Sequence, residues 1–302
     1  MTSVAVHFAS GAAFFTGAVC LFAGIVAVIR GKHRILRPVG RLLILLGVFA
    51  IASSATPLPM WAYGIWAASL LSWVVCRTGV KIIQRKWQTY ALVICVGCTF
   101  FAVSWELSYQ LPPRPPAGRW DRLVVVGDSL SAEDFTEGGD PWPKLLERGH
   151  GIHVDNLAFS GAQSASAAKR VGSEDLTGAL VLLEIGGNDL LGAVSTIDFE
   201  HGLERLLSLV CRDDNSVVML ELPLPPLYNG YGEVQRRLAQ KHHVLLIPKR
   251  YFAGVLASAG DRVDGVHLSA AGHKKMCEML WTLLSSCLVD SALRIPHSEL
   301  PP

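Results

Sequence analysis

The sequence predicts an α/β protein: a doubly wound three-layer α/β/α sandwich with a parallel sheet, preceded by an all-α transmembrane helical region. Three observations predict it. The first 109 residues hold four apolar runs, each near the roughly 20 residues that cross a bilayer. A proline-rich linker follows at 110–120. Beyond it, apolar runs alternate with helix-like stretches through 121–290, before a tail at 291–302.

Charge separates the two halves of the chain. All 25 acidic residues lie at or after Glu106, whereas nine of the 27 basic residues precede it. The first 105 residues therefore carry +9, and the remainder, with 18 basic against 25 acidic residues, carries −7. This asymmetry indicates that the two halves occupy different environments.

The N-terminal half is predicted to span a membrane. Its apolar runs lie at 4–29, 39–56, 60–76 and 88–109. A soluble all-helical domain would need charged outer faces, which these runs lack. No acid or base lies at mid-depth, which argues against a pump or an ion channel. Small residues in these runs would let the helices pack closely against one another, against a partner protein or against a second copy of the chain. They are Gly11, Gly17, Gly24, Gly47, Gly64 and Gly97.

Basic residues in the loops predict the orientation. Segments 30–41 and 77–87 contain five and four Lys/Arg, and such loops favour the cytoplasmic side. We therefore expect an integral membrane protein of a bacterial inner membrane with four spans. Both termini and the second domain would lie on the extracytoplasmic, periplasmic side. No basic residue precedes the first apolar run, which disfavours a cleaved signal peptide.

The second half is predicted to form five parallel strands that are covered on both faces, because its strand candidates are continuous apolar runs. They lie at 122–127, 152–158, 179–185, 216–222 and 243–248. Helices are expected at 141–149, 164–171, 198–210, 231–242, 251–258 and 269–287. Such sheets gather functional groups beyond the carboxyl ends of their strands.

Cysteines give no sign of a metal or redox site. Cys95 and Cys98 form a C-x-x-C pair inside the fourth run, where they are expected to be small packing residues rather than zinc or redox ligands. Cys277 and Cys287 share one predicted helix about 15 Å apart, too far for a bridge. At most one disulfide, through Cys211, is therefore possible. We expect neither a metal nor a cofactor.

A candidate nucleophile and its base follow strand ends. The stretch "VVVGDSLSAED" (124–134) presents Ser129 just beyond the first strand, and an ordinary strand-to-loop turn is the alternative. A serine hydroxyl needs a base, and the base needs an orienting acid. In "VDGVHLSAAGH" (263–273), Asp264 and His267 are three residues apart, so the carboxylate can orient the imidazole toward Ser129. Alone, this spacing is a weak signal, and a helix-capping Asp near a surface His is its commoner explanation.

Two further loops supply hydrogen-bond donors for an oxyanion. Gly161 in "NLAFSGAQS" can offer a backbone N–H, and Asn188 in "EIGGNDLLG" can offer its side-chain amide. Each alone fits a loop glycine or a capping Asn. All these features together favour a catalytic site, whereas Asp128 and Asp189 are interpreted as loop-fixing residues.

These blocks carry a family resemblance. In the order "GDSLS", "NLAFSGAQS", "GGND" and "DGVHLSAAGH", residues 121–288 resemble the SGNH (GDSL) hydrolases, most closely the thioesterase I/lysophospholipase L1/arylesterase branch. The resemblance implies a flavodoxin-like domain in which Ser129 is the nucleophile, His267 the base and Asp264 its orienting acid. It also implies an oxyanion hole made of the Ser129 and Gly161 N–H groups and the Asn188 side chain. Position 131 is Ser, which departs from the G-x-S-x-G elbow of α/β-hydrolases.

The expected function is a membrane-anchored serine esterase that hydrolyses an acyl ester or thioester of a lysophospholipid, another lipid or an O-acylated envelope glycan. One alternative is an acyltransferase that moves an acyl group to an envelope polysaccharide with a partner protein. Another is a non-catalytic membrane scaffold that binds acylated ligands. The expected partners are the acylated substrate and the lipid bilayer, with a membrane partner or a homo-oligomer through the helices. No nucleic acid is expected.

Overall fold

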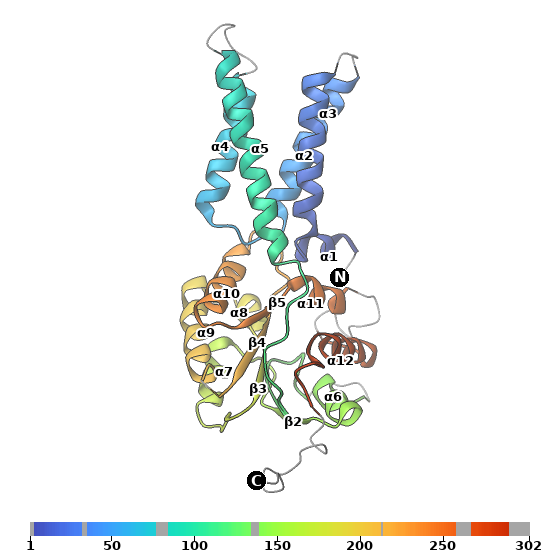
Figure 1. Cartoon of the computed structure of the whole chain (residues 1–302), viewed down its shortest axis with the longest axis vertical. Helices are drawn as coiled ribbons and strands as arrows, with labels where there is room; N and C mark the ends of the chain where they lie inside the picture. Colours follow the sequence, from blue (N-terminus) through green and yellow to red (C-terminus); the bar gives the residue numbers. More distant parts are fainter. Residues whose placement is uncertain are drawn as a thin grey trace, which may run out of the picture. The chain divides into compact units, whose positions relative to one another are not determined.

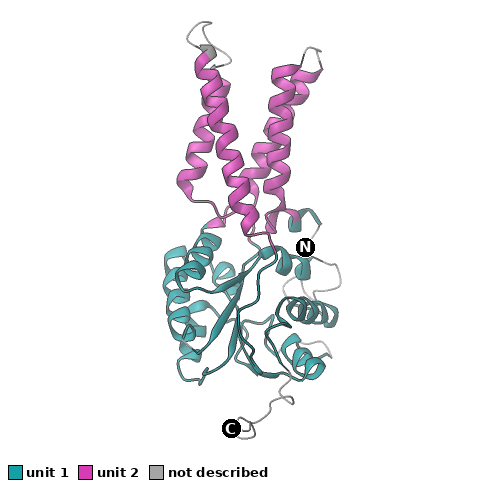
Figure 2. Ribbon diagram, viewed as in Figure 1, with its two compact units in different colours: residues 1–6, 112–223, 230–302 teal, residues 7–111, 224–229 magenta. Residues whose placement is uncertain are grey.

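The computed structural model describes residues 3–31, 35–76, 84–133, 139–212, 214–257 and 267–289. The chain divides into two compact units, which Figure 2 colours separately. The helical unit comprises His7–Leu111 and Leu224–Asn229. The sheet unit comprises Met1–Val6, Pro112–Pro223 and Gly230–Pro302.

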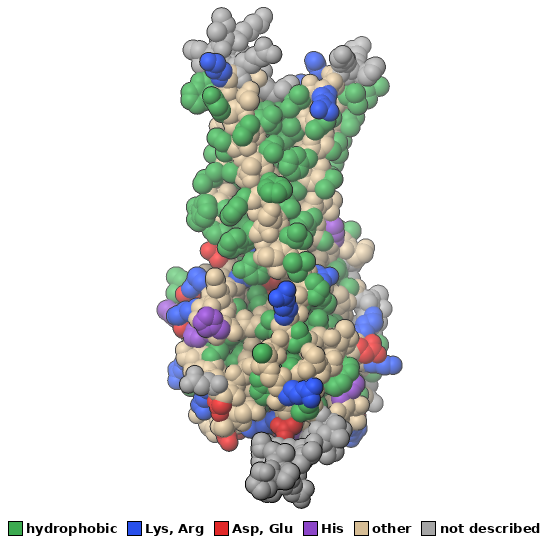
Figure 3. Space-filling view, viewed as in Figure 1, with side chains coloured by type: hydrophobic (Ala, Val, Ile, Leu, Met, Phe, Trp, Pro, Cys, Tyr) green, Lys and Arg blue, Asp and Glu red, His purple; other side chains and the backbone are tan. Residues whose placement is uncertain are grey.

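Apolar helices make up most of the N-terminal half. They are α1 (Ser3–Ala9), α2 (Ala12–Arg30), α3 (Leu36–Ser53), α4 (Met60–Cys76) and α5 (Gln84–Ser108). Within the described ranges, three segments are long and apolar enough to cross a membrane: Ala12–Arg30, Leu36–Ser53 and Lys86–Ser108. The apolar helix Met60–Val75 is shorter. Hydrophobic side chains cover the face of this unit that Figure 3 shows, and charged side chains gather on the sheet unit.

The first apolar run differs from the prediction, because two helices replace one continuous helix over 4–29. The break falls at Gly11, whose φ of 83° lies in the left-handed region. Glycine adopts this conformation without the steric cost of a Cβ. The N–H of Ala12 bonds to Ser10 Oγ at 3.4 Å, which satisfies one donor at the start of α2.

Two pairs of glycines bring α2 and α3 into backbone contact. A Cβ placed on Gly17 would lie 2.8 Å from the carbonyl oxygen of Gly47, and one on Gly24 would lie 2.6 Å from that of Gly40. Real Cβ atoms do not approach so closely, so no larger residue fits without a shift of the helices. The close packing expected from the small residues therefore forms, for Gly17 and Gly24, within the same chain.

The sheet unit is built on five parallel strands in the order β2-β1-β3-β4-β5. These are β1 (Arg122–Gly127), β2 (His153–Asn156), β3 (Leu180–Glu184), β4 (Ser216–Leu220) and β5 (Leu245–Ile247). The helices are α6 (Trp142–His150), α7 (Ser164–Val171), α8 (Gly187–Leu191), α9 (Thr196–Val210), α10 (Asn229–Lys241), α11 (Lys249–Leu256) and α12 (Ala270–Leu284). In Figure 1, α6, α11 and α12 cover one face of the sheet, and α7, α9 and α10 cover the other. The predicted doubly wound sandwich is confirmed.

The hydrophobic core explains why the strands are apolar throughout. In β1 and β3 the side chains are buried on both faces of the sheet. Val125, Leu182 and Val218 pack in one cluster with Trp142 of α6 and Met276 of α12. A strand that is buried on both faces cannot alternate apolar and polar residues, which accounts for the continuous apolar runs.

The edge strand β2 is shorter than the predicted 152–158. Asn156 Oδ1 accepts the N–H of Ala158 at 3.2 Å, a local bond that bends the chain away from extended structure. The N–H of Leu157 still donates to Val125 O at 2.8 Å, so the chain follows β1 toward its carboxyl end.

The other edge strand, β5, is shorter than the predicted 243–248 for a different reason. His243 has a φ of 55°, so the chain turns there before the strand begins. Pro248 then stands at the N-cap of α11 and ends the strand.

The segment after α12 closes the sheet unit. The N–H of Trp120 donates to Cys287 O at 2.8 Å, and the N–H of Val289 donates to Trp120 O at 2.9 Å. Trp120, two residues before β1, is therefore bonded to the segment that follows α12. This contact lies at the end of the predicted 110–120 linker.

Candidate active site

Ser129 lies in a tight turn directly after β1. The N–H groups of Ser131 and Ala132 both donate to the carbonyl oxygen of Asp128, at 3.1 and 3.0 Å. Ser129 is half-buried at the outside of this turn. β1 and β3 are adjacent, and the connection that leaves β1 leads to β2 on one side whereas the connection that leaves β3 leads to β4 on the other. Doubly wound sheets bind ligands where connections diverge in this way.

Asn188 lies in α8, just after the adjacent strand β3. Its Nδ2 donates to Asp128 Oδ2 at 3.2 Å, and Asp128 Oδ1 accepts the N–H of Leu130 at 2.9 Å. One carboxylate therefore fixes both the turn that carries Ser129 and the amide of Asn188. Because an amide nitrogen has two hydrogens, Asn188 keeps a second N–H for another acceptor.

Behind this turn lies a buried acid, Glu184, at the end of β3. Its Oε2 accepts the hydroxyl of Ser131 at 2.9 Å and the N–H of Asp128 at 3.3 Å. Burial raises the pKa of Glu184 well above its usual range, and the neighbouring charge of Asp128 raises that pKa further. Burial at the end of β3 therefore favours the protonated, neutral form of Glu184 more than exposure to solvent would.

The pKa of Asp128 is subject to opposing effects. Burial raises its pKa, whereas hydrogen bonds from the Leu130 N–H and from Glu184 lower it, as does the charge of His267. The side chains of Glu184 and Asp128 share a hydrogen bond, and the Asp128 carboxyl group also accepts from Asn188. The result is a continuous path of hydrogen bonds from the buried end of β3 to the amide of Asn188.

Ser131 and Gly127 show why the turn has this sequence. Ser131 Oγ accepts the indole N–H of Trp142 at 3.2 Å while it donates to Glu184. A Cβ on Gly127 would lie 2.8 Å from Ser131 Oγ and 3.1 Å from Glu184 Oε2. Glycine at 127 therefore leaves room for the buried pair, and serine at 131 occupies a polar position where an α/β-hydrolase elbow would have glycine.

The loop after β2 carries Gly161 in the left-handed region, with a φ of 75°. It is anchored to α8 by Asp189, whose carboxylate accepts the N–H and the hydroxyl of Ser164 at 2.9 and 2.7 Å. Gln163 Nε2 also donates to Asn188 O at 3.4 Å. These contacts are those of a loop-fixing residue, as interpreted for Asp189, and they bring the Gly161 loop beside Asn188.

His267 immediately precedes α12, whose N-cap is Ser269, with its Oγ accepting the N–H of Gly272 at 3.2 Å. The imidazole of His267 is close enough to Asp128 for its charge to lower the pKa of the Asp128 carboxyl group. Asp264 falls in 258–266, outside the described residues, so its role stays a prediction.

The role of Glu184 was not predicted from the sequence, although a signal was present. An acid inside the otherwise apolar run "ALVLLEI" (179–185) has to be buried, and a buried acid needs partners. Its partner Ser131 is 53 residues away along the chain, so no local pattern could name it.

Cysteine does not offer an alternative nucleophile in the sheet unit. Burial raises the pKa of Cys211 to about 11, so its thiol stays protonated at neutral pH. Burial also raises the pKa of Cys277 and of Cys287. All three are free thiols, so the possible disulfide through Cys211 does not form in this structure.

Comparison with known proteins gives one consistent result. Residues 125–275 match the GDSL-like Lipase/Acylhydrolase family. Esterase TesA of Pseudomonas aeruginosa is 28% identical over 179 residues, which cover 55% of this chain and 89% of that protein. The arylesterase of Vibrio mimicus is 30% identical over 140 residues, covering 42% and 70%.

A further protein and a solved structure are similar to this chain. The thioesterase 1/protease 1/lysophospholipase L1 of Escherichia coli K12 is 27% identical over 156 residues, which cover 49% of this chain and 75% of that protein. A crystal structure of TesA is similar with 27% identity and a TM-score of 0.48, covering 55% of this chain and 99% of that one.

Proposed function

Because the chain belongs to the GDSL-like lipase/acylhydrolase family, we propose that it is a membrane-anchored serine esterase whose nucleophile is Ser129. The observation that carries the proposal is the set of contacts around Asp128, the residue next to Ser129. Asp128 accepts a hydrogen bond from Asn188, and the charge of His267 lowers the pKa of the Asp128 carboxyl group. These contacts support a site in which the proposed nucleophile, oxyanion donor and base act together.

The reaction proceeds in two steps through an acyl-enzyme. His267 removes the hydroxyl proton of Ser129, and Ser129 Oγ attacks the carbonyl carbon of an ester or thioester. The oxyanion accepts hydrogen bonds from the backbone N–H groups of Ser129 and Gly161 and from the second N–H of Asn188. His267, oriented by Asp264, returns the proton to the leaving alcohol or thiol, and water then releases the acid by the same route.

Asp128 and Glu184 act as positioning residues in this scheme. Protonated Glu184 holds Asp128, and Asp128 fixes one N–H of Asn188 so that the other points toward the developing charge. Such preorganised donors stabilise a transition state because they need no rearrangement during the reaction. The burial of Glu184 and its bond to Ser131 support this assignment.

The proposed substrate is an acyl ester or thioester of a lysophospholipid, another lipid or an O-acylated envelope glycan. The proposed topology has four spans, with the basic loops at 30–41 and 77–87 in the cytoplasm and the sheet unit on the extracytoplasmic side. Three helices that are long and apolar enough to cross a membrane support the anchoring.

The test is Ser129→Ala in the full-length protein in detergent. Hydrolysis of a short-chain aryl ester should fall by about 10³-fold or more, and labelling by a fluorophosphonate should disappear. The matched control is Ser173→Ala, because the Ser173 hydroxyl is exposed and donates to Arg170 O at 3.0 Å. Wild-type hydrolysis by Ser129→Ala would overturn the assignment. Profiles across acyl chain lengths and head groups, with and without an acceptor sugar, would then define the substrate.

A further inference from the structure

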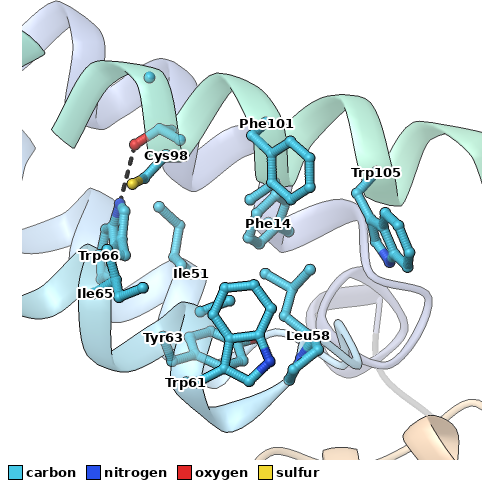
Figure 4. Close-up of a pocket in the computed structure, with 15 residues that line it drawn as sticks. Phe14, Ile51, Leu58, Trp61, Tyr63, Ile65, Trp66, Cys98, Phe101 and Trp105 are labelled. Atoms are coloured by element: carbon cyan, nitrogen blue, oxygen red, sulfur yellow. Dashed lines mark hydrogen bonds between the residues drawn. The ribbon is translucent and has the colours of Figure 1, made fainter. Parts of the chain in front are cut away.

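The helical unit contains a cavity of about 250 Å³ between α2, α4 and α5 (Figure 4). The segment that joins α3 to α4 closes one side of it. Its walls are aromatic and aliphatic, and no charged side chain lines it. The main lining residues are Phe14, Leu58, Trp61, Tyr63, Trp66 and Phe101.

Three polar groups in the wall, those of Tyr63, Trp66 and Thr99, already bond within the helical unit. The hydroxyl of Tyr63 donates to Thr56 O at 2.7 Å. The indole N–H of Trp66 donates to Thr99 Oγ1 at 3.0 Å, and the Thr99 hydroxyl donates to Cys95 O at 2.8 Å. A polar ligand would lose its water here without gaining equivalent bonds, which disfavours head groups and sugars as occupants.

The size of the cavity fits a length of hydrocarbon chain. An apolar cavity of about 150 Å³ in another protein is large enough to bind benzene. A volume of about 250 Å³ therefore accepts a longer, flexible apolar group. The cavity is open on one side, because Trp61 and Phe101 in its wall are 65% and 57% exposed, so an apolar chain can enter it from outside the helical unit.

The location identifies the source of the hydrocarbon. Trp61 is near the start of α4 and Trp105 is near the end of α5, and both line the cavity. Because Trp prefers the interface between membrane and water, the cavity lies near one surface of the bilayer. This is the end of α5 from which the chain continues into the 110–120 linker. The hydrocarbon available at this depth is that of the lipids.

We propose that this cavity binds the acyl chain of a membrane lipid, with the head group left at the surface from which the linker leaves. The proposal rests on the proposed membrane insertion of α2, α3 and α5, and it is independent of the chemistry at Ser129. One helix would be enough to anchor the protein. The proposal gives the further helices a second role, the recruitment of lipid.

Gly97 and Gly64 provide a matched pair of variants. Gly97 lines the cavity and Gly64 does not, and a Cβ added to either would meet nothing within 4 Å. Leucine should therefore be tolerated in both helices, where it is also a better helix former than glycine. Gly97→Leu fills the cavity, whereas Gly64→Leu leaves it open. Ala62→Leu, on the α4 wall, is a second filling variant in case Gly97→Leu misfolds.

The experiment places the full-length protein in phosphatidylethanolamine vesicles doped with a phospholipid that carries a diazirine in its acyl chain. After photolysis, adducts are mapped by peptide mass spectrometry. Leu45 and Phe49 of α3 are exposed and report contact with bulk lipid. We expect adducts within 58–66 and 97–105 to exceed those on α3. Gly97→Leu should lose this excess, and Gly64→Leu should keep it.

Two results would overturn the proposal. Equal labelling of the cavity and of α3, unchanged by Gly97→Leu and Ala62→Leu, would mean contact with bulk lipid only. If neither the cavity segments nor α3 were labelled, the helices would not enter the bilayer. Fluorophosphonate labelling of Ser129 in the same samples reports separately on the proposed esterase chemistry, so the two proposals can fail independently.

Discussion

The helical unit and the sheet unit bury polar groups in opposite ways. In the helical unit, α2 and α3 meet through glycine backbones, and buried hydroxyls such as that of Thr99 bond to nearby carbonyl groups. Among the described residues, the helical unit buries one acid, Glu106, whereas the sheet unit buries several ionisable side chains, including Glu184 and Glu221 at the carboxyl ends of its strands. Helices satisfy their own backbone, so packing dominates their association. Strands are followed by loops, whose backbone groups need polar side chains as hydrogen-bond partners. These polar side chains stabilise the loops and can also take part in a reaction.

The largest expected effect concerns Glu221, just after β4. Its Oε1 accepts from Arg236 Nε at 2.7 Å and lies 3.5 Å from Lys249 Nζ, and all three side chains are buried. Glu221→Ala would leave two buried cations without this carboxylate. We expect a loss of about 3–5 kcal/mol in the free energy of unfolding of the sheet unit, measured by urea denaturation and circular dichroism.

The control for that variant is Glu200→Ala, which removes a more exposed pair with Arg237. Exposed pairs contribute about 0–1 kcal/mol, so its stability should remain close to that of the wild type. If Glu221→Ala and Glu200→Ala lost similar free energies of unfolding, the burial of charged side chains would not explain the stability of the sheet unit.

The next effect tests whether packing governs the helical unit. In Gly24→Val, the new Cβ would lie 2.6 Å from Gly40 O and 2.8 Å from the backbone nitrogen of Ile44. The helices would have to separate, at a cost of about 1–3 kcal/mol. Thermal unfolding in detergent, followed by size-exclusion chromatography, should show the loss. Gly64→Val, with nothing within 4 Å of its Cβ, should unfold as the wild type does.

The smallest effect, and the most specific one, concerns pH. The folded state raises the pKa of Glu184 above its usual 4.5, so the stabilisation linked to its proton is complete below that pH. It is lost as pH rises through the folded pKa. Glutamine at 184 stays neutral, so the stability of Glu184→Gln should decline less than that of the wild type toward alkaline pH. The two should differ by about 1 kcal/mol or less in acid.

Denaturation midpoints across a pH series measure this difference. Glu204→Gln is the opposite control, because a hydrogen bond from Lys241 lowers the pKa of the Glu204 carboxyl group. Its linked stability is present above pH 4.5 and lost as pH falls. Parallel curves for Glu184→Gln and the wild type would mean that Glu184 does not stay protonated in the folded protein.

Local signals in the sequence predicted much of the fold, and they predicted where the candidate site residues lie relative to the strands. β1 begins and ends where its apolar run does, and Ser129 and Asn188 follow strand ends as expected. Contacts between distant residues could not be predicted in this way. Glu184 needs Ser131, and Gly24 needs Gly40, and neither pairing leaves a pattern within a short window of sequence. The catalytic roles of Ser129, His267 and Asp264, and the oxyanion-hole roles of Gly161 and Asn188, remain predictions.

The space beside Gly127 has an evolutionary consequence. Because a Cβ there would meet both Ser131 Oγ and Glu184 Oε2, the three positions cannot vary independently. A side chain at 127 becomes acceptable only after the neighbouring groups shrink, so substitutions should show strong epistasis in double-mutant cycles. In a family alignment, positions 127, 131 and 184 should therefore covary as one unit, although they come from two different strands and the turn that follows one of them.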